Sequence, residues 1–219
     1  MISRWVVKTA VSALAAMGLA SLAAWFTLPA DTRVPLHFDA AGEVDRYGSL
    51  AEGLVMMPLI AAAVFLLIFW LGKQEPRKAN LQRSRQLLDW TVTGSMVLLA
   101  AIHLAILGLA AGWDFSVTRL ISFGLGLLFV LIGNFLPKTR SNFLVGVRTP
   151  WTLSSDYSWL RTHIWGGRGF VLLGVVIIAV AAWAPAMSAY AILAGTLSLA
   201  FGLIVASWFF WRNDPEMRS

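Results

Sequence analysis

The 219-residue sequence contains no cysteine and few charged residues. The absence of cysteine excludes disulfides, thiolate metal ligands and cysteine nucleophiles. Charged residues make up 13% of the chain and hydrophobic residues 58%, whereas roughly a quarter of the residues in soluble domains are charged. This composition indicates a membrane protein. The 11 tryptophans fit this class, because their rings gather at the two membrane–water interfaces.

Basic residues outnumber acidic residues by 17 to 11, which gives a net charge of +6. An excess of basic residues can indicate nucleic-acid binding, but the sequence has no basic helix or soluble domain to carry it. The arginines and lysines stand beside apolar runs, so anionic head groups are the expected counter-charge. We therefore expect membrane lipids, and no nucleic acid, as partners.

Long runs without charge predict the membrane-spanning helices. A bilayer core about 30 Å thick needs around 20 apolar residues in a helix. Four runs of 18 to 24 residues have this length, and a fifth run of 43 residues allows two crossings, with a turn at Pro185 and Ser188. The five runs are 9–30, 53–72, 90–113, 120–137 and 169–211. The predicted fold class is all-α: a polytopic membrane bundle of six transmembrane helices.

The positions of the basic residues predict the orientation of this bundle. Both termini lie on one side, because the number of spans is even. If that side is the cytoplasm, 14 of the 17 basic residues, Arg218 among them, lie inside and only Arg33, Arg46 and Arg119 lie outside. The positive-inside rule therefore predicts cytoplasmic N- and C-termini. The first run exceeds the roughly 7–15 apolar residues of a signal peptide, so we expect it to remain as an anchor.

We expect two halves of three helices each. The first, 1–113, contains an acidic outer loop at 31–52, and the second, 114–219, contains a cytoplasmic loop at 137–168.

The outer loop carries an imidazole and several carboxylates, at His37, Asp39, Glu43 and Asp45. One interpretation is a divalent-cation site formed by His37, Asp39 and Asp45, the one cofactor that we consider. The other, which we favour because the cluster has no fixed metal-binding spacing, is a structured turn. In that turn Gly42 takes a positive φ and Asp39 accepts hydrogen bonds from nearby amides. The acids would also attract a cationic or amphipathic peptide, or they simply keep the loop soluble.

Residues 134–163 read NFLPKTRSNFLVGVRTPWTLSSDYSWLRTH, and we name this stretch the signature segment. It resembles the SdpI family of membrane immunity proteins, in which G-N-x-x-P-K, N-x-x-x-G-x-R-T-P-W-T and W-x-x-T-H follow one another. The matching residues are Gly133, Asn134, Pro137, Lys138, Asn142, Gly146, Arg148, Thr149, Pro150, Trp151, Thr152, Trp159, Thr162 and His163. The outer loop also resembles a short N-terminal module of unassigned function that accompanies this family, through Pro35, His37, Phe38, Gly42, Asp45 and Ser49.

The resemblance implies a multi-pass protein of the bacterial cytoplasmic (inner) membrane that protects its host against a secreted, membrane-active peptide toxin. It also implies signalling, in which detection of the toxin leads to capture of a cytoplasmic repressor, a regulatory protein. Two alternatives stay open: a small transporter or channel, and a metal-dependent membrane enzyme that uses the outer acids or His163 with Arg148. The sequence has no GxSxG or HExxH motif, so we favour a protein without catalytic residues.

The candidate ligand- or partner-binding residues of the signature segment are Asn134, Lys138, Asn142, Arg148, Thr149, Trp151, Trp159 and His163. In one interpretation Arg148, Trp159 and His163 form a cytoplasmic docking or gating surface, where Arg148 holds a carboxylate or a lipid phosphate. In the other, which we favour, they lock the loop against the helix ends, and Arg148 donates to backbone carbonyls. A short helix is expected from Asp156, capped by Ser154 or Ser155, with Trp159 and His163 on one face.

His103 is the one ionisable residue deep within a predicted span. A charged imidazole is costly in the bilayer, so we expect a neutral ring that makes an interior hydrogen bond, with a proton relay or ligand contact as the alternative. Gly108 and Gly112 have the small-residue spacing that permits close helix contact.

Overall fold

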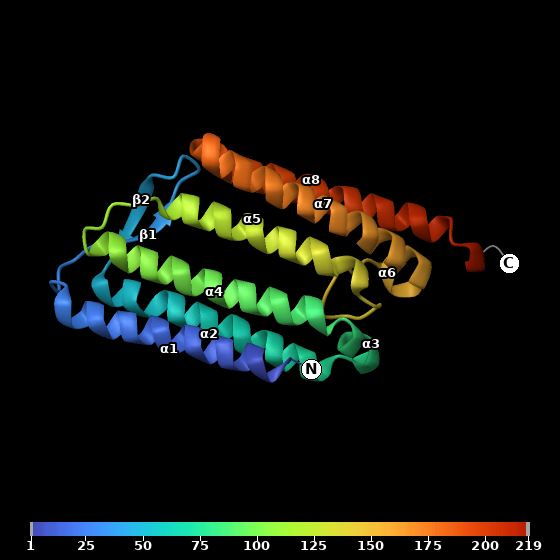
Figure 1. The fold of residues 1–219 in the computed structure, drawn as a ribbon, viewed down its shortest axis with the longest axis horizontal. Helices are drawn as coiled ribbons and strands as arrows, with labels where there is room; N and C mark the ends of the chain where they lie inside the picture. The colour runs from blue at the N-terminus through green and yellow to red at the C-terminus, as the bar shows by residue number, and fades with distance from the viewer. Residues whose placement is uncertain (1, 218–219) are drawn as a thin grey trace.

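The computed structural model describes residues 2–217 and contains six long helices (Figure 1). They are α1 (Arg4–Thr27), α2 (Leu50–Gln74), α4 (Arg85–Ala110), α5 (Val117–Phe135), α7 (Asp156–Trp183) and α8 (Ser188–Arg212). Each is long and apolar enough to cross a bilayer, which confirms the predicted six-helix fold class. The helices alternate in direction, so both chain ends face the same side. We name this side the terminal end; Arg218 lies outside the described residues.

Short elements join the long helices at both ends of the bundle. At the terminal end lie α3 (Lys78–Arg83), η1 (Leu136–Lys138), α6 (Pro150–Ser154) and η3 (Pro215–Met217), and at the opposite end lies η2 (Pro185–Met187). The outer loop forms an antiparallel hairpin of β1 (Val34–Phe38) and β2 (Val44–Gly48), which the sequence analysis did not predict. We name the side that carries it the hairpin end.

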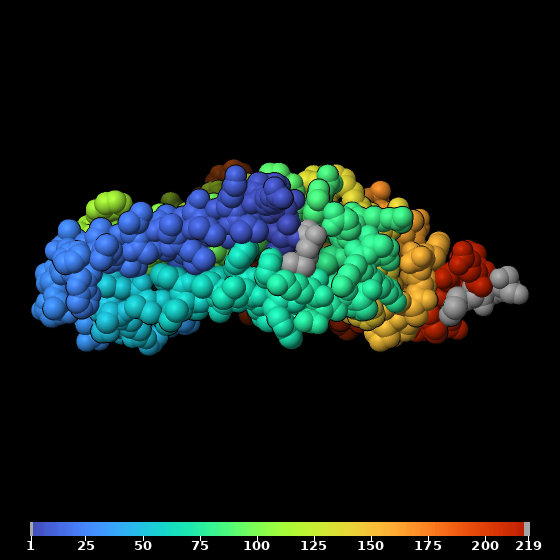
Figure 2. Space-filling model, turned by 90° about the horizontal axis from the view of Figure 1, so that it is seen from below, coloured from blue at the N-terminus to red at the C-terminus, as the bar shows by residue number. Residues whose placement is uncertain are grey.

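The helices form one continuous bundle. Helices α1, α2 and α4 pack together, α4 also contacts α5, α5 lies against α7, and α8 packs mainly on α7. Figure 2 shows α1 and α2 side by side along the molecule, with the chain around α3 at one end. The predicted division into two halves at residue 113 stays a prediction.

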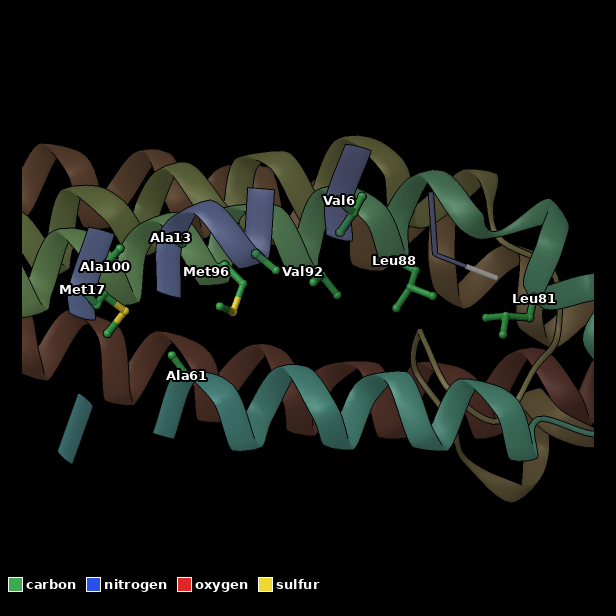
Figure 3. Packing of buried hydrophobic residues seen from close by; sticks show 10 residues of the cluster. Val6, Ala13, Met17, Ala61, Leu81, Leu88, Val92, Met96 and Ala100 are labelled. Carbon is green, nitrogen blue, oxygen red and sulfur yellow. The ribbon is translucent and has the colours of Figure 1, made fainter. Parts of the chain in front are cut away.

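The main apolar core lies between α1, α2 and α4 (Figure 3). From α4 it takes Leu88, Val92, Met96 and Ala100, which are four residues apart and therefore lie on one helix face. Met17 of α1 is completely buried against them. Val6, Ala10 and Ala61 are also buried in this cluster, with at most 1% of each residue exposed. The remaining apolar faces of the helices stay exposed, as a lipid environment requires.

Helices α5 and α7 approach each other more closely than side chains would allow. A Cβ atom on Gly133 would lie 2.6 Å from the carbonyl oxygen of Gly167, and a Cβ on Gly126 would lie 2.8 Å from that of Gly174. The two glycines of each helix are seven residues apart, so they face the same way. The glycines therefore allow close packing of α5 against α7. The close helix contact predicted at Gly108 is not formed, because Gly108 faces the rings of Trp113 and Phe115.

The fifth long helix begins earlier than its charge-free run. The short helix expected from Asp156 is the first part of α7, which continues without a break to Trp183. The cap is Ser155, whose hydroxyl accepts a hydrogen bond from the Ser158 amide at 2.9 Å. Within the predicted loop at 137–168, the long irregular stretch is 139–149, and residues 156–168 belong to α7.

Candidate functional site

The candidate site is the irregular chain between η1 and α6, which we name the 139–149 loop. Because the loop has no regular secondary structure, its backbone groups need other partners. Asn142 supplies three of them. Its side-chain oxygen accepts from the amides of Leu144 at 2.9 Å and Val145 at 2.8 Å, and its amide group donates to the carbonyl of Arg140 at 2.8 Å. The Asn142 side chain is fully buried, so it shapes the loop and offers no surface to a partner.

A buried carboxylate at the end of α2 holds the loop from the N-terminal side. Glu75 is 3% exposed, and its side chain accepts hydrogen bonds from the amide of Phe143 at 3.0 Å and of Arg77 at 2.9 Å. The Arg77 guanidinium donates to the hydroxyl of Ser141 and, at 3.0 Å, to the carbonyl of Leu153, and it lies 4.8 Å from the ring centre of Phe143.

Two more residues beside α3 extend this attachment. The Asn80 side chain donates to the carbonyl of Ser141 at 2.8 Å, and the Ser84 hydroxyl accepts from the amide of Arg140 at 2.9 Å. The site residues predicted from the sequence do not include Glu75, Arg77, Asn80 or Ser84. One signal was present: Glu75 is the single acid in a connector that is otherwise basic.

His163 and Trp159 hold the other side of the loop. Their rings stack with centroids 4.0 Å apart. The His163 Nδ1 donates to the carbonyl of Trp159 at 2.7 Å, and Nε2 accepts from the amide of Val147 at 2.9 Å. Since Nε2 is an acceptor, this geometry requires the neutral imidazole with its proton on Nδ1. The loop fits tightly here because Gly146 has φ +111° and a Cβ on it would lie 2.4 Å from Nε2.

The end of the loop is fixed by a capping box. The Thr149 hydroxyl accepts from the Thr152 amide at 3.2 Å, while the Thr152 hydroxyl accepts from the Thr149 amide at 2.9 Å. Thr149 also donates to the Ser207 hydroxyl of α8 at 3.0 Å. Leu144 and Val145 pack against the core of α1 and α4. The 139–149 loop therefore contacts parts of the chain that lie far apart in the sequence.

The candidate residues of the signature segment divide into two groups by burial. Asn142, Thr149, Trp159 and His163 are buried, and their side chains lie together around the loop; Trp151 is partly buried. Asn134, Lys138 and Arg148 are exposed.

The Arg148 guanidinium donates to the carbonyl of Phe143 at 2.6 Å, within its own loop. This bond is the one that the locking interpretation expects of Arg148. The burial of Asn142, Thr149, Trp159 and His163 favours the same interpretation for them.

At the hairpin end the structure forms the turn that we favoured. Gly42 has φ +91°, and the Asp39 carboxylate accepts from the amides of Ala41 at 2.8 Å and Glu43 at 3.0 Å. His37 pairs with Asp45 at 2.6 Å. Within residues 2–217 no three histidine, aspartate or glutamate side chains gather as metal ligands would. The cation site stays a prediction, testable by calorimetry.

A cavity of about 330 Å³ lies beside this hairpin. It is lined by β1, the start of α5 and the start of α8, and the lining residues include Phe38, Ile121 and Ile192. Ser188 also lines it, and the buried Ser188 hydroxyl has no hydrogen-bond partner in the described part of the chain. An apolar cavity with one unsatisfied polar group is suited to an amphipathic ligand.

His103 lies inside the bundle, as expected. It is fully buried, and Nε2 is 3.0 Å from the hydroxyl of Ser21, which itself donates to the carbonyl of Leu54 at 2.7 Å. Since the hydroxyl proton is used in that bond, the imidazole Nε2 donates to Ser21. This contact ties α4 to α1 and α2.

Comparison with known proteins agrees with the resemblance seen in the sequence. Residues 138–210 match the SdpI/YfhL protein family, and residues 13–62 match a domain of unknown function, DUF1648. The chain is 26% identical over 132 residues to the immunity protein SdpI of Bacillus subtilis (strain 168). That match covers 59% of this chain and 64% of the relative, slightly less than two thirds of its length. No solved structure matches the chain. The predicted resemblance to SdpI is thus confirmed.

Proposed function

We propose that this protein is an immunity protein of the bacterial cytoplasmic membrane, which protects its cell against a secreted, membrane-active peptide. The observation that carries the proposal is the match to the immunity protein SdpI. The match lies on a chain with six helices that can cross a bilayer, which supports a location in the membrane that such a peptide would attack.

We further propose that the terminal end faces the cytoplasm. The exposed basic side chains Lys138, Arg140 and Arg148 lie there, whereas the hairpin end carries most of the acids. The natural absence of cysteine makes the test direct, because one introduced thiol is the sole labelling site. In intact cells a membrane-impermeant maleimide should label Ala41→Cys and leave Arg140→Cys unlabelled until the membrane is opened. The reverse pattern would overturn the orientation.

In this orientation the outer cavity is where the peptide would first bind. The acids of the hairpin raise the encounter rate of a cationic peptide, and the apolar lining beside Phe38 takes an apolar side chain. Ile192→Trp fills the cavity without changing the charge. We expect it to reduce protection, whereas Leu193→Trp, on the exposed face of the same helix, should leave protection unchanged.

The role of the protein in immunity is tested by deleting its gene and exposing the cells to a panel of membrane-active peptides. The deletion strain should become sensitive to at least one peptide, and the wild-type copy should restore resistance. Equal survival of deletion and parent strains across the panel would contradict immunity. Signalling needs a separate readout: crosslinking at Arg140→Cys should capture a cytoplasmic regulatory protein only after peptide exposure.

A further inference from the structure

A groove of about 480 Å³ runs between α5 and α7 near the terminal end. Its floor is formed by Gly133 and Gly167, where the two backbones touch: a Cβ on Gly167 would lie 2.6 Å from Pro137 and 2.7 Å from the carbonyl oxygen of Gly133. Because backbone forms this floor, helix packing rather than side-chain rotamers sets the shape of the groove.

The groove is polar at one end and apolar along the rest of its length. Asn134 and Arg168 line the polar end, and both side chains are exposed. Neither makes a hydrogen bond, an ion pair or a ring contact with any of residues 2–217. Leu172 and Val175, which are 66% and 51% exposed, line the apolar part.

These polar groups lie close to the level of the lipid head groups. Asn134 precedes Lys138, at the end of the span, by four residues, which is about 6 Å along a helix. The head-group layer is about 5–8 Å thick on each side of the hydrocarbon core. Asn134 and Arg168 therefore stand at the boundary of the hydrocarbon, where an amide and a guanidinium without partners are costly.

The one charged residue that lines the groove, Arg168, is basic. Between residues 117 and 212 the only acid is Asp156, which precedes Arg168 by twelve residues and so lies about 18 Å away along α7. Lys138 adds a second exposed positive charge, with its ammonium 4.7 Å from the ring centre of Phe135. A second copy of this chain in the groove would place its own basic side chains next to these cations, which would repel each other. The charge therefore favours an anionic occupant.

We propose that this groove binds one anionic phospholipid. The lipid phosphate accepts hydrogen bonds from the Arg168 guanidinium and from the Asn134 amide. The planar guanidinium can donate to a phosphate in bidentate fashion. One acyl chain then lies along Leu172 and Val175. This site is independent of the proposed immunity function and of the orientation, since either leaflet can supply the lipid.

Native mass spectrometry of the full chain in detergent tests the site, with dioleoylphosphatidylglycerol and dioleoylphosphatidylcholine added at equal concentration. The wild type should retain one phosphatidylglycerol in preference to phosphatidylcholine. Arg168→Gln should weaken this retention about fivefold, as loss of one basic group near an anionic head group predicts. Asn134→Leu should also weaken it. Arg140→Gln, which removes an exposed charge of the same end outside the groove, is the matched control.

A second variant keeps the test valid if the polar substitutions disturb folding. Leu172→Trp obstructs the acyl-chain part without changing the charge, and it should lower retention while the elution volume and helical content stay those of the wild type.

Three results would overturn the proposal. The wild type could retain the two lipids equally, Arg140→Gln could lose as much phosphatidylglycerol as Arg168→Gln, or soluble glycerol 3-phosphate could displace the lipid completely. A dimer mass that disappears in Leu172→Trp, with no lipid adduct, would assign the groove to a second copy instead.

Discussion

Replacing Gly146 by alanine tests whether the 139–149 loop is held against α7. Two costs add at this position. Gly146 has φ +111°, a conformation that costs an alanine about 1–3 kcal/mol. The new Cβ would also lie 2.4 Å from the His163 Nε2 and 3.1 Å from the Trp159 ring. Relieving that contact separates Nε2 from the Val147 amide, and an unsatisfied buried amide costs about 1–3 kcal/mol more.

Gly112→Ala separates the two costs. Gly112 also has a positive φ, +86°, but a Cβ there would have no atom within 4 Å. It should therefore show the backbone cost alone. The measurement is unfolding in mixed micelles, followed by tryptophan fluorescence. We expect Gly146→Ala to be more destabilising than Gly112→Ala by about 1–3 kcal/mol. Equal destabilisation by the two substitutions would refute the packing of the loop against His163.

Three further outcomes are expected. Glu75→Ala removes the acceptor of the Phe143 and Arg77 amides and should lower the free energy of unfolding by about 2–4 kcal/mol, whereas Glu43→Ala in the exposed hairpin should leave it unchanged; equal effects would contradict the buried attachment. His103→Leu should cost about 1 kcal/mol, because Ser21 keeps its bond to α2; lost protection at unchanged stability would instead assign His103 a proton-relay or ligand role. Calorimetry with zinc, calcium and magnesium should give equal heats for the wild type and His37→Ala; a heat lost in the variant would establish a metal site.

The sequence predicted the six spans because charge is excluded from the bilayer core. It did not predict that the short helix from Asp156 continues into the fifth span, because Arg161 and Arg168 interrupt the apolar run although the helix continues through them. A long arginine side chain can stay on the surface of a helix and reach the head groups, so charge alone marks the membrane boundary and not the helix boundary. The hairpin was missed for another reason: its five-residue strands alternate too weakly in polarity to predict pairing.

The turn and the cap were predictable because each depends on neighbouring residues. Gly42 and Asp39 act within five residues of chain, and Ser155 caps the helix that begins next to it. The partners of the 139–149 loop were not predictable in this way. Glu75 reaches the Phe143 amide across 68 residues, and no local pattern of polar residues indicates which distant backbone a buried carboxylate will satisfy.

The burial of much of the signature segment limits where the proposed cytoplasmic partner could bind. An irregular loop that leaves water must find a partner for each backbone group, and here Asn142, Thr149 and His163 serve that need. The charged side chains that residues 138–149 leave exposed are basic: Lys138, Arg140 and Arg148. A regulatory protein that binds to this stretch would therefore need an acidic surface, and its binding should weaken as salt concentration rises. The buried residues would influence that binding only by holding the loop that presents these cations.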